Sequence, residues 1–499
     1  MADPKIVILV HGWSVTNTNT YGELAARLKS AAGAQGLPVD IKNIWLSKYV
    51  SFADEVSVED LARGFEAAIH RELGKELKKG RRFACITHST GGPVIRDWWA
   101  RFHPENGTKE CPMSHLVMLA PANFGSALAQ LGKSRVSRLK TWFQGVEPGQ
   151  GVLNWLELGS PASWDLNHDW IHRDMDPVEG HAPVFPFVLT GQTIDRKLYD
   201  NLNPYTGELG SDGVVRVPAA NLNATYIRLV QNPHNAANPN ELVLDKKRFK
   251  TTQRTAFALI RGHAHSGEEK GILRSIKDDG KPHPTVRAIM ACLKVQTSAE
   301  YVKVHQIFEN ENQKVRQSEL IEKRSGFFTT RYFIHDQRSM VTIRLRDHLG
   351  HSVTDFDFLL TGGRNNPDLL PESFFVDRQR NSRDRGTLTY FINHTLMEGS
   401  AAIRHKPDNH TVRPALQPMT TLGLRIIPRP GEGFVHYREA VLRASKQHLT
   451  NFLNADQTTL VDIVLRRVVG RGVFALKNSN SADPKGEDFR RQKPGSPIL

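Results

Sequence analysis

A serine flanked by small residues is the first candidate for chemistry in this chain. Residues 83–94 read FACITHSTGGPV, an apolar run that breaks at Ser89 and continues through Thr90 into two glycines. We interpret this pattern as a strand, a sharp turn and a helix start, because a serine presented at such a turn adopts a strained backbone conformation that bulky neighbours would crowd. Ser89 is therefore a candidate nucleophile. The pattern departs from G-x-S-x-G at Thr87, and the alternative is an ordinary strand-to-helix turn.

A second candidate element lies near the N-terminus. Residues 5–10, KIVILV, predict a buried parallel strand, since apolar β-branched runs that end at glycine are typical of one. The loop that follows, HGWS at residues 11–14, can direct a backbone N–H toward a developing oxyanion if it lies beside the nucleophile turn. We therefore assign the oxyanion hole to the N–H groups of Trp13 and Thr90.

The His-Gly loop, the HSTGG turn and their order resemble the α/β-hydrolase superfamily, specifically its lipase and esterase branch, over roughly residues 1–290. The loop PANFGS at residues 121–126 is similar to a loop that lipases carry after the next strand. The resemblance implies a bacterial phospholipase-like serine hydrolase with no cofactor, in which the nucleophile, the acid and the base follow one another along the chain.

Asp212 is the predicted acid of a catalytic triad. It lies in SDGVV, residues 211–215, between small residues and after a predicted strand. A carboxylate in such a place can turn inward, hold an imidazole in one tautomer and stabilise its charged form. The run also resembles the acid loop of lipases. The alternative is an aspartate that only makes a β-turn, in which case Asp195 or Asp200 would be the acid.

Two histidines compete for the role of general base, and both lie in GHAHSG, residues 262–267. We prefer His265 to His263 because lipases often place the base before a small polar residue, and Ser89, Asp212, His265 is the chain order of the superfamily. An H-x-H pair also suits half of a metal site, but no acidic residue or cysteine lies at a helpful spacing. We therefore expect no metal.

The segments around these motifs alternate between strands and helices, which predicts βαβ units and a doubly wound parallel sheet. Ser89 would then lie at the carboxyl ends of the strands, where open α/β sheets hold their sites. We expect helices at residues 21–32, 58–79, 94–100 and 284–293, and further strands at residues 39–46, 115–120, 184–191 and 225–230.

Residues 126–180 interrupt this alternation and carry four of the eight tryptophans. An insertion of that length without strands is usually functional, and indoles suit a helical cap whose rings reach a lipid interface. The alternative is that the indoles pack the cap onto the sheet.

Beyond about residue 298 short extended segments alternate with turns. They predict an antiparallel β-sandwich-like unit, covered by a helix at residues 438–453. We expect an α/β-hydrolase catalytic domain at residues 1–295, a β-rich accessory domain at residues 296–476 and a disordered tail at residues 477–499. The predicted strands of the second domain lie at residues 327–334, 341–346, 353–360, 387–393, 422–427 and 460–469.

The composition is that of a folded chain, with 499 residues of which 39% are hydrophobic and 24% charged. No window approaches the roughly 18 apolar residues of a transmembrane helix, and the chain enters its first strand almost at once, so we expect neither a membrane span nor a signal peptide. The three cysteines fit a reducing compartment. We expect a protein that is cytoplasmic as synthesised, with export by a signal-independent secretion system as a hypothesis.

The sequence thus predicts a serine hydrolase of carboxylic esters that favours lipids, above all phospholipids, and forms an acyl-enzyme. The net charge of +14 suits an anionic membrane surface, whereas no motif favours nucleic acid. A lipid hydrolase without a signal peptide raises the hypothesis of an antibacterial effector with an immunity or secretion partner. The alternatives are a soluble-ester or thioester hydrolase and a catalytically silent binding protein on the same scaffold.

Overall fold

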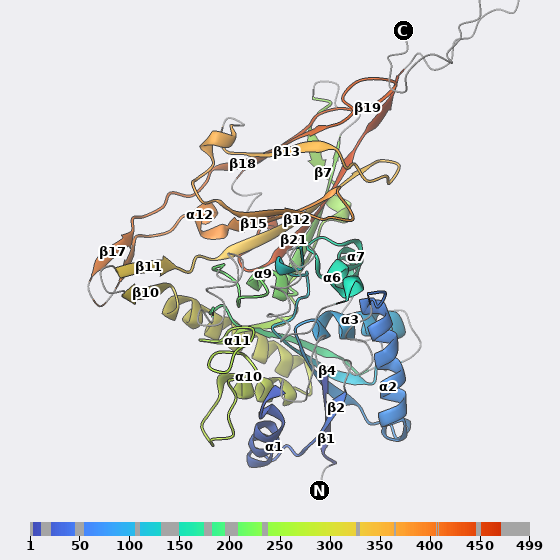
Figure 1. The fold of residues 1–499 in the computed structure, drawn as a ribbon, viewed down its shortest axis with the longest axis vertical. Coiled ribbons are helices and arrows are strands. Elements are labelled where there is room, and N and C mark those ends of the chain that lie inside the picture. The colour runs from blue at the N-terminus through green and yellow to red at the C-terminus, as the bar shows by residue number, and fades with distance from the viewer. Residues whose placement is uncertain are drawn as a thin grey trace, which may run out of the picture.

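The computed structural model of the chain describes residues 3–10, 21–44, 54–104, 110–130, 149–173, 182–194, 208–231, 238–325, 330–363, 366–405, 407, 409–445 and 451–470. Two layers are stacked along the long axis, with helices around a parallel sheet at one end and β-sheets at the other (Figure 1). Within the described residues no helix is long and apolar enough to cross a membrane. The tail predicted at residues 477–499 lies outside them.

A six-stranded sheet occupies the end that carries the N-terminus. Its strand order is β2-β1-β3-β4-β5-β9, and all its pairings are parallel. Apolar runs form these strands because helices bury both faces of the sheet. The predicted doubly wound parallel sheet is confirmed. Its strands are β1 (Lys5–Val10), β2 (Val39–Ile44), β3 (Phe83–His88), β4 (Met113–Leu119), β5 (Phe185–Thr190) and β9 (Ala256–Leu259).

Helices cover both faces of this sheet with separate apolar cores. One face of the sheet carries α1 (Leu24–Ala34), α10 (Pro284–Leu293) and α11 (Ser298–Ser318). The opposite face carries α2 (Val58–Lys78) and α3 (Gly91–Phe102). The helices α6 (Gln150–Leu156) and α7 (Pro161–His172) pack on α2 and α3 and share their apolar core. The apolar residues of α2 recur at helical spacing on its buried side, as expected for an amphipathic helix on a sheet.

The described part of the cap consists mainly of α6 and α7, and its tryptophans face inward. Trp155, Trp164 and Trp170 are 6%, 2% and 5% exposed and belong to the apolar core beneath the cap. Trp170 packs edge-on against Trp99 of α3. These three indoles therefore lie in the core and do not reach a lipid interface. The fourth, Trp142, lies outside the described residues.

The second layer is built on a mixed seven-stranded sheet, ordered β14-β15-β12-β21-β6-β7, with β8 also paired to β6. Its centre is parallel, because β21 pairs in parallel with both β12 and β6, and its remaining pairings are antiparallel. Its strands are β6 (Ala224–Gln231), β7 (Leu242–Leu244), β8 (Lys250–Thr252), β12 (Arg338–Asp347), β14 (Phe375–Arg380), β15 (Thr387–Asn393) and β21 (Thr458–Leu465).

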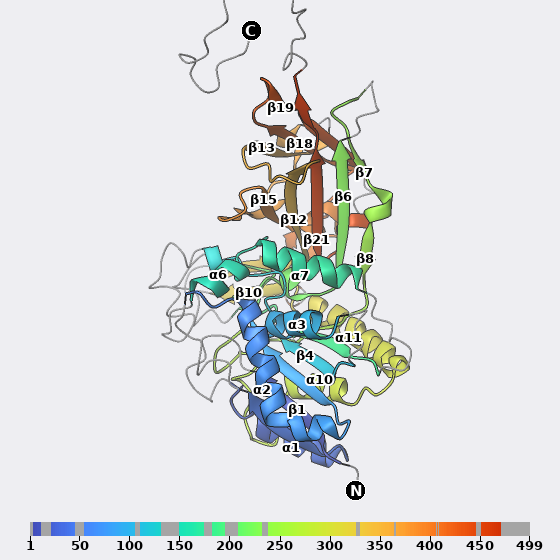
Figure 2. The same ribbon diagram turned by 90° about the vertical axis from the view of Figure 1, so that its right-hand side faces the viewer.

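The strand predicted at residues 225–230 exists as β6, but it belongs to this second sheet. It runs between β21 and the short strands β7 and β8 (Figure 2). The strand that completes the first sheet is β9, which the sequence pattern did not single out.

A three-stranded antiparallel sheet, β13-β18-β20, covers one face of the seven-stranded sheet, and the two share an apolar core. We call this pair of sheets the β-sandwich. The strands of the smaller sheet are β13 (Phe356–Thr361), β18 (Thr421–Pro428) and β20 (Ala440–Ser445). Two-stranded ribbons accompany them: β10 (Ile321–Ser325) with β11 (Thr330–Ile334), β16 (Ile403–His405) with β17 (His410–Arg413), and β19 (Val435–Tyr437) with β22 (Arg467–Val469).

Two predictions of helix and strand in this region are wrong. Residues 440–445, predicted as part of a helix at 438–453, form β20, because their alternating side chains pair antiparallel with β18. Residues 298–318, which the sequence placed in the β-rich domain, form the 21-residue helix α11. A capping box between Thr297 and Glu300 starts that helix, and the pattern T-x-x-E was readable in the sequence.

The two layers are joined by apolar packing. Met340 of β12 and Leu460 of β21 belong to the same buried cluster as α2, α3 and the cap. Figure 2 shows α6 and α7 between α3 and the long strands of the β-sandwich. The β-sandwich therefore lies directly above the helices that surround the nucleophile turn.

Candidate active site

Ser89 lies where β3 ends and α3 begins. Its φ of 54° is in the left-handed region, which residues other than glycine rarely adopt. Its N–H donates to the carbonyl of Leu119 at 3.0 Å, which ties the turn to the end of β4. Ser89 itself is partly exposed, whereas His88 and Thr90 on either side are buried. The turn thus presents the hydroxyl in the manner that the sequence predicts.

Close packing requires the glycine at position 92. A Cβ on Gly92 would lie 2.8 Å from Cβ of Pro121, in the loop after β4, and 3.5 Å from Cγ of Met118. The start of α3 can approach that loop only because residue 92 has no side chain. The second glycine of the HSTGG motif, Gly92, therefore does more than leave room around Ser89.

His265 lies in a loop that follows β9, and its Nε2 is 3.1 Å from Ser89 Oγ. Backbone bonds fix this loop: the N–H of Ala264 donates to the carbonyl of Lys270, and the N–H of Ile272 donates to the carbonyl of Ala264, both at 2.8 Å. The imidazole is held in an interior environment, since His265 is only 4% exposed. Backbone hydrogen bonds on both sides of His265 therefore hold the imidazole in place.

Asp212 is fully buried and faces His265. Its Oδ2 is 2.9 Å from His265 Nδ1, and its Oδ1 accepts the N–H groups of Val214 and Val215 at 3.0 and 2.7 Å. Both carboxylate oxygens therefore have hydrogen-bond partners, as a buried charge requires. The loop holds its own aspartate in the orientation that directs one oxygen at the imidazole.

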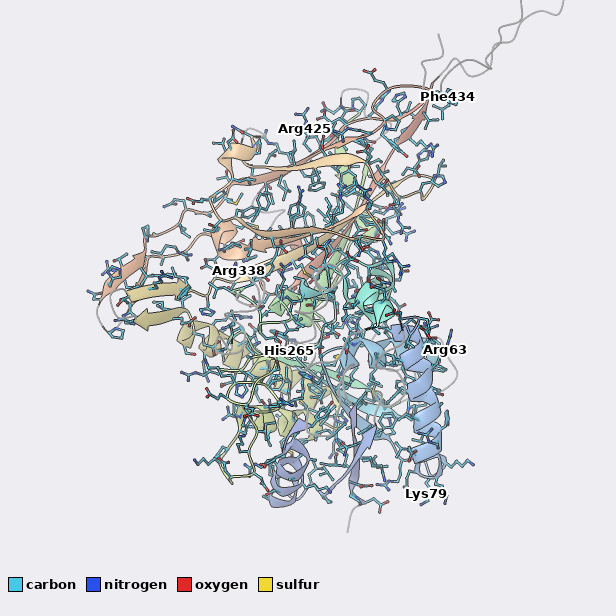
Figure 3. All side chains as sticks on the ribbon, viewed as in Figure 1. Arg63, Lys79, His265, Arg338, Arg425 and Phe434 are labelled. Carbon is cyan, nitrogen blue, oxygen red and sulfur yellow. The ribbon has the colours of Figure 1, made fainter. Side chains whose placement is uncertain are left out.

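The side chains of Ser89, His265 and Asp212 thus form one hydrogen-bonded chain. In such a chain the carboxylate accepts a hydrogen bond from Nδ1–H, which leaves the lone pair of Nε2 free to take a proton from the serine hydroxyl. This is the geometry of nucleophilic acyl transfer. His265 lies near the middle of the molecule in Figure 3, below Arg338 of the β-sandwich.

The other predicted site residues lie as follows. The Nδ1 of His263 is 2.7 Å from the carbonyl oxygen of Arg261, and its Nε2 is 3.5 Å from His283. Burial lowers the pKa of His263, against the hydrogen bond to Arg261. The hydrogen-bond partner of Ser89 is His265. Thr90 is buried at the N-terminus of α3, where backbone N–H groups favour negative charge. The remaining candidates, Trp13, Asp195 and Asp200, lie outside the described residues.

His88 is a site residue that the sequence pattern did not single out. Its ring centroid is 4.8 Å from that of His265, and its Nε2 is 3.3 Å from the carbonyl oxygen of His265. It therefore packs against the base from the side of β3. Its position next to Ser89 in the HSTGG motif was the only signal available.

A buried arginine also escaped the sequence analysis. Arg96 of α3 donates to Asn123 Oδ1 at 3.3 Å and to Asn167 Oδ1 of α7 at 3.1 Å, and its guanidinium lies 5.0 Å from the ring centroid of Trp170. Burial lowers the pKa of Arg96 to about 9. This network joins the nucleophile helix to the loop after β4 and to the cap.

Among the described residues no group of three or more histidine, cysteine, aspartate or glutamate side chains is placed to hold a metal ion. The H-x-H pair does not act as a unit there, because His265 pairs with Asp212 and His263 contacts His283.

Two solved structures are similar to the chain over almost its whole length. The phospholipase PlaB from Legionella pneumophila matches with a TM-score of 0.84 and 42% sequence identity, over 96% of this chain and 97% of that one. A structure of PlaB from the same organism in complex with thio-NAD matches with a TM-score of 0.83 and 41% identity, over 96% and 97% of the two chains. No protein-family model and no curated protein matches the chain. Such identity over nearly all of both chains goes beyond a shared fold.

Proposed function

The chain belongs to the α/β-hydrolase family of the Legionella phospholipase PlaB, and from this premise we propose that it is a serine hydrolase that cleaves carboxylic esters of phospholipids through an acyl-enzyme. The observation that carries the proposal is the hydrogen-bonded chain from Ser89 Oγ through His265 to Asp212. These three residues lie on three different loops at the carboxyl ends of strands, where an open α/β sheet holds its site.

In the proposed reaction Ser89 Oγ attacks the ester carbonyl carbon while His265 Nε2 takes the hydroxyl proton. The imidazolium then gives that proton to the leaving alcohol, and the acyl group remains on Ser89. In the second half His265 takes a proton from water as the water oxygen attacks the acyl carbon. The bond from that carbon to Ser89 Oγ then breaks, the imidazolium returns its proton to Ser89 Oγ, and the fatty acid leaves. Asp212 keeps His265 in the tautomer that both halves need and stabilises its charged form.

The oxyanion of each tetrahedral intermediate needs donors that are in place beforehand. We assign this role to the N–H of Thr90, at the start of α3, and to that of Trp13. The position of Thr90 directly after Ser89 supports the assignment, because the residue after the nucleophile supplies one donor in this superfamily.

Phospholipid is proposed as the substrate because the family relative is a phospholipase, and the net charge of +14 suits the anionic surface on which such lipids are presented. The cap tryptophans give this preference no support, since the three described ones are buried. The lipid preference therefore rests on the relative and on charge.

The test compares the wild type with Ser89→Ala on mixed phospholipid vesicles, with the products identified by mass spectrometry. We expect fatty acid and lysophospholipid from the wild type and a loss of roughly 10⁶-fold in turnover in the variant, the effect known for removing a triad serine. More than about a hundredth of the wild-type rate in Ser89→Ala would place the nucleophile elsewhere.

Two rival functions make different predictions in the same assay. A soluble-ester or thioester hydrolase would cleave short-chain substrates and leave vesicles intact. A binding protein that has lost catalysis would not react with a fluorophosphonate, since only an activated serine does so. Labelling at Ser89 together with release of fatty acid excludes both.

A further inference from the structure

The loop that carries Asp212, residues 210–216, is closed at its base by bonds between its two ends. Ser211 and Arg216 pair as an antiparallel bridge, and the N–H of Asp212 donates to the carbonyl of Val215 at 3.1 Å. We call this segment the acid loop. Because its two ends are paired, a displacement of Arg216 displaces Asp212 as well.

On one side the acid loop is bonded to the parallel-sheet layer. Ser126 Oγ, in the loop after β4, donates to the carbonyl of Val214 at 2.7 Å. The N–H of Phe124 donates to the carbonyl of Ala219, in the short helix α9 (Val217–Ala220) that follows the acid loop. These bonds explain why the PANFGS loop is part of the site although none of its residues reacts.

On its other side the acid loop is held by the β-sandwich through Arg216. This side chain is 2% exposed, and its Nε and Nη2 donate to Glu208 at 2.8 and 3.0 Å. The same Nη2 donates to Asp377 of β14, and the guanidinium lies 4.3 Å from the ring centroid of Phe391 in β15. Burial would lower the pKa of Arg216, but the two carboxylates hold that pKa above its usual value.

A second contact brings β12 against the loop. Gly210 has a φ of +82°, and a Cβ there would lie 2.7 Å from Cδ of Arg338. The Arg338 side chain therefore occupies the space beside the loop, and its guanidinium lies 5.6 Å from the ring centroid of Phe391. Gly210 and Arg216, at the two ends of the acid loop, thus both contact strands of the β-sandwich.

Of the two carboxylates on Arg216, only that of Asp377 comes from outside this segment. Glu208 lies two residues before the loop in the same segment, so its ion pair moves with the loop. Asp377 lies in another layer, 161 residues away from Arg216 in the chain. The bond between Arg216 and Asp377 is therefore a direct charged link between the acid loop and a different layer.

We propose that Asp377, acting through Arg216, is a positioning residue for Asp212, so that the β-sandwich completes the catalytic site. The inference rests on the proposed function, because it concerns the same triad. The bond of 2.9 Å between Asp212 and His265 depends on where the acid loop lies. A displacement of about 1 Å far from the chemistry can lower turnover by about 10²-fold.

The test is Asp377→Asn in the full chain, assayed on a soluble ester and on phospholipid vesicles. Active enzyme is counted by fluorophosphonate labelling, so that a loss of folded protein is not read as a loss of turnover. We expect kcat to fall by about 10- to 100-fold on both substrates, with KM unchanged. The acid limb of the pH profile should move to lower pH, because an imidazole less stabilised by Asp212 binds its proton more weakly.

A double variant tests whether Asp377 affects turnover through Asp212. If Asp377 acts through Asp212, then Asp377→Asn in an Asp212→Asn background should lower the residual activity by less than about 2-fold, because residues that act as a unit are not additive. Arg216→Lys is the second variant, since lysine keeps the charge but loses the planar fork that bridges Glu208 and Asp377. It should reproduce the kcat loss and the pH shift, and Asp377→Glu should recover part of the activity.

The matched control is Asp347→Asn. Asp347 is also a buried aspartate of the β-sandwich, at the far end of β12 from Arg338, and it pairs with Arg467 and His351. It should lower the melting temperature and leave kcat and the pH profile unchanged.

Unchanged kcat in folded, fully labelled Asp377→Asn and Arg216→Lys would overturn the inference, and so would a full additional loss in the double variant. Failure of the proposed function has a different signature, since Ser89→Ala would then retain turnover in the same assays.

Discussion

Asp212 and His265 are joined twice, once through their side chains and once through their backbones. The carboxylate Oδ2 lies 2.9 Å from Nδ1 of the imidazole, and the N–H of His265 donates to the carbonyl of Asp212 at the same distance. The second bond does not depend on the nature of the side chain at position 212. A substitution there can therefore change the chemistry of the pair while the two loops stay together.

Asp212→Asn should lower kcat by a factor on the order of 10³ to 10⁴. An asparagine stabilises the wrong imidazole tautomer and does not stabilise the imidazolium. The melting temperature should change little, since the backbone bond to His265 remains. Steady-state kinetics and a thermal melt check both parts. Asp195→Asn and Asp200→Asn are the comparison variants. If either of them causes the large loss, the acid has been assigned to the wrong residue.

His265→Ala should abolish turnover and His263→Ala should leave it measurable, because His265 is the hydrogen-bond partner of Ser89 whereas His263 contacts His283. Rates on a soluble ester, normalised to folded protein, decide between them. The reverse result would transfer the role of base to His263.

Gly92→Ala should damage both stability and activity. The new Cβ would lie 2.8 Å from the rigid ring of Pro121, so the start of α3 must shift. We expect a loss of about 1 to 3 kcal/mol in the free energy of unfolding and a fall in kcat of up to about 10²-fold as the nucleophile turn moves. Gly64→Ala in α2 is the control, since apart from the backbone of α2 itself no atom lies within 4 Å of its Cβ position. It should stabilise the protein by about 0.5 to 1 kcal/mol and leave kcat unchanged, as measured by urea unfolding and kinetics.

The stability of the fold should fall in mild acid, in part through His115 of β4. Burial, with a smaller contribution from Lys5, lowers the pKa of His115 from 6.5 to about 3. The folded state thus prefers the neutral ring, and the unfolded chain binds more protons between these two values. The contribution of the neutral His115 ring to the free energy of unfolding is complete above pH 6.5 and is lost as the pH falls toward about 3. By pH 5 the loss should be on the order of 2 kcal/mol.

Urea unfolding of the wild type and of His115→Gln from pH 7 to pH 5 checks this contribution. The variant should show a flatter dependence of the unfolding free energy on pH. Parallel curves for the two proteins would mean that His115 binds its proton equally well in the folded and unfolded chains.

Vesicle binding should weaken with salt if the basic surface holds the protein on anionic lipid. Each basic residue near such a surface contributes about 1 kcal/mol, and salt screens it beyond a Debye length of roughly 8 to 10 Å. Co-sedimentation with anionic and with neutral vesicles at low and high salt measures the effect, and Ser89→Ala prevents hydrolysis during the assay. Binding that is equal under all four conditions would rule out electrostatic attachment.

The features that could be predicted from the sequence are those that depend on residues close together in the chain. The apolar runs of β1, β3 and β4, the small residues around Ser89 and the SDGVV turn each depend on neighbours within a few positions. Such patterns predict a strand, a strained turn or a buried loop without knowledge of the rest of the chain. The order of Ser89, Asp212 and His265 then followed from the family resemblance.

Other features were decided by partners far away in the chain. The sequence of residues 440–445 is compatible with a helix or a strand. Antiparallel pairing with β18 makes them the strand β20. The apolar strand β6 fits either sheet, and pairing with β21 placed it in the second one. A tryptophan side chain can lie at a lipid interface or in a core. The packing of the cap against α3 buried the cap tryptophans that the structure describes.

The sequence determined the chemistry available to this protein, because reactive side chains are set by residue type and their turns by immediate neighbours. The sequence favoured His265 over His263 through the serine that follows it, but only the tertiary structure brings His265 Nε2 to 3.1 Å from Ser89 Oγ, since that distance depends on how two separate loops pack. The tertiary structure alone linked Arg216 to Asp377, because a buried ion pair between residues 161 positions apart leaves no local pattern. Bonds within a turn can be predicted from short sequence patterns, whereas contacts between layers exist only once the chain has folded.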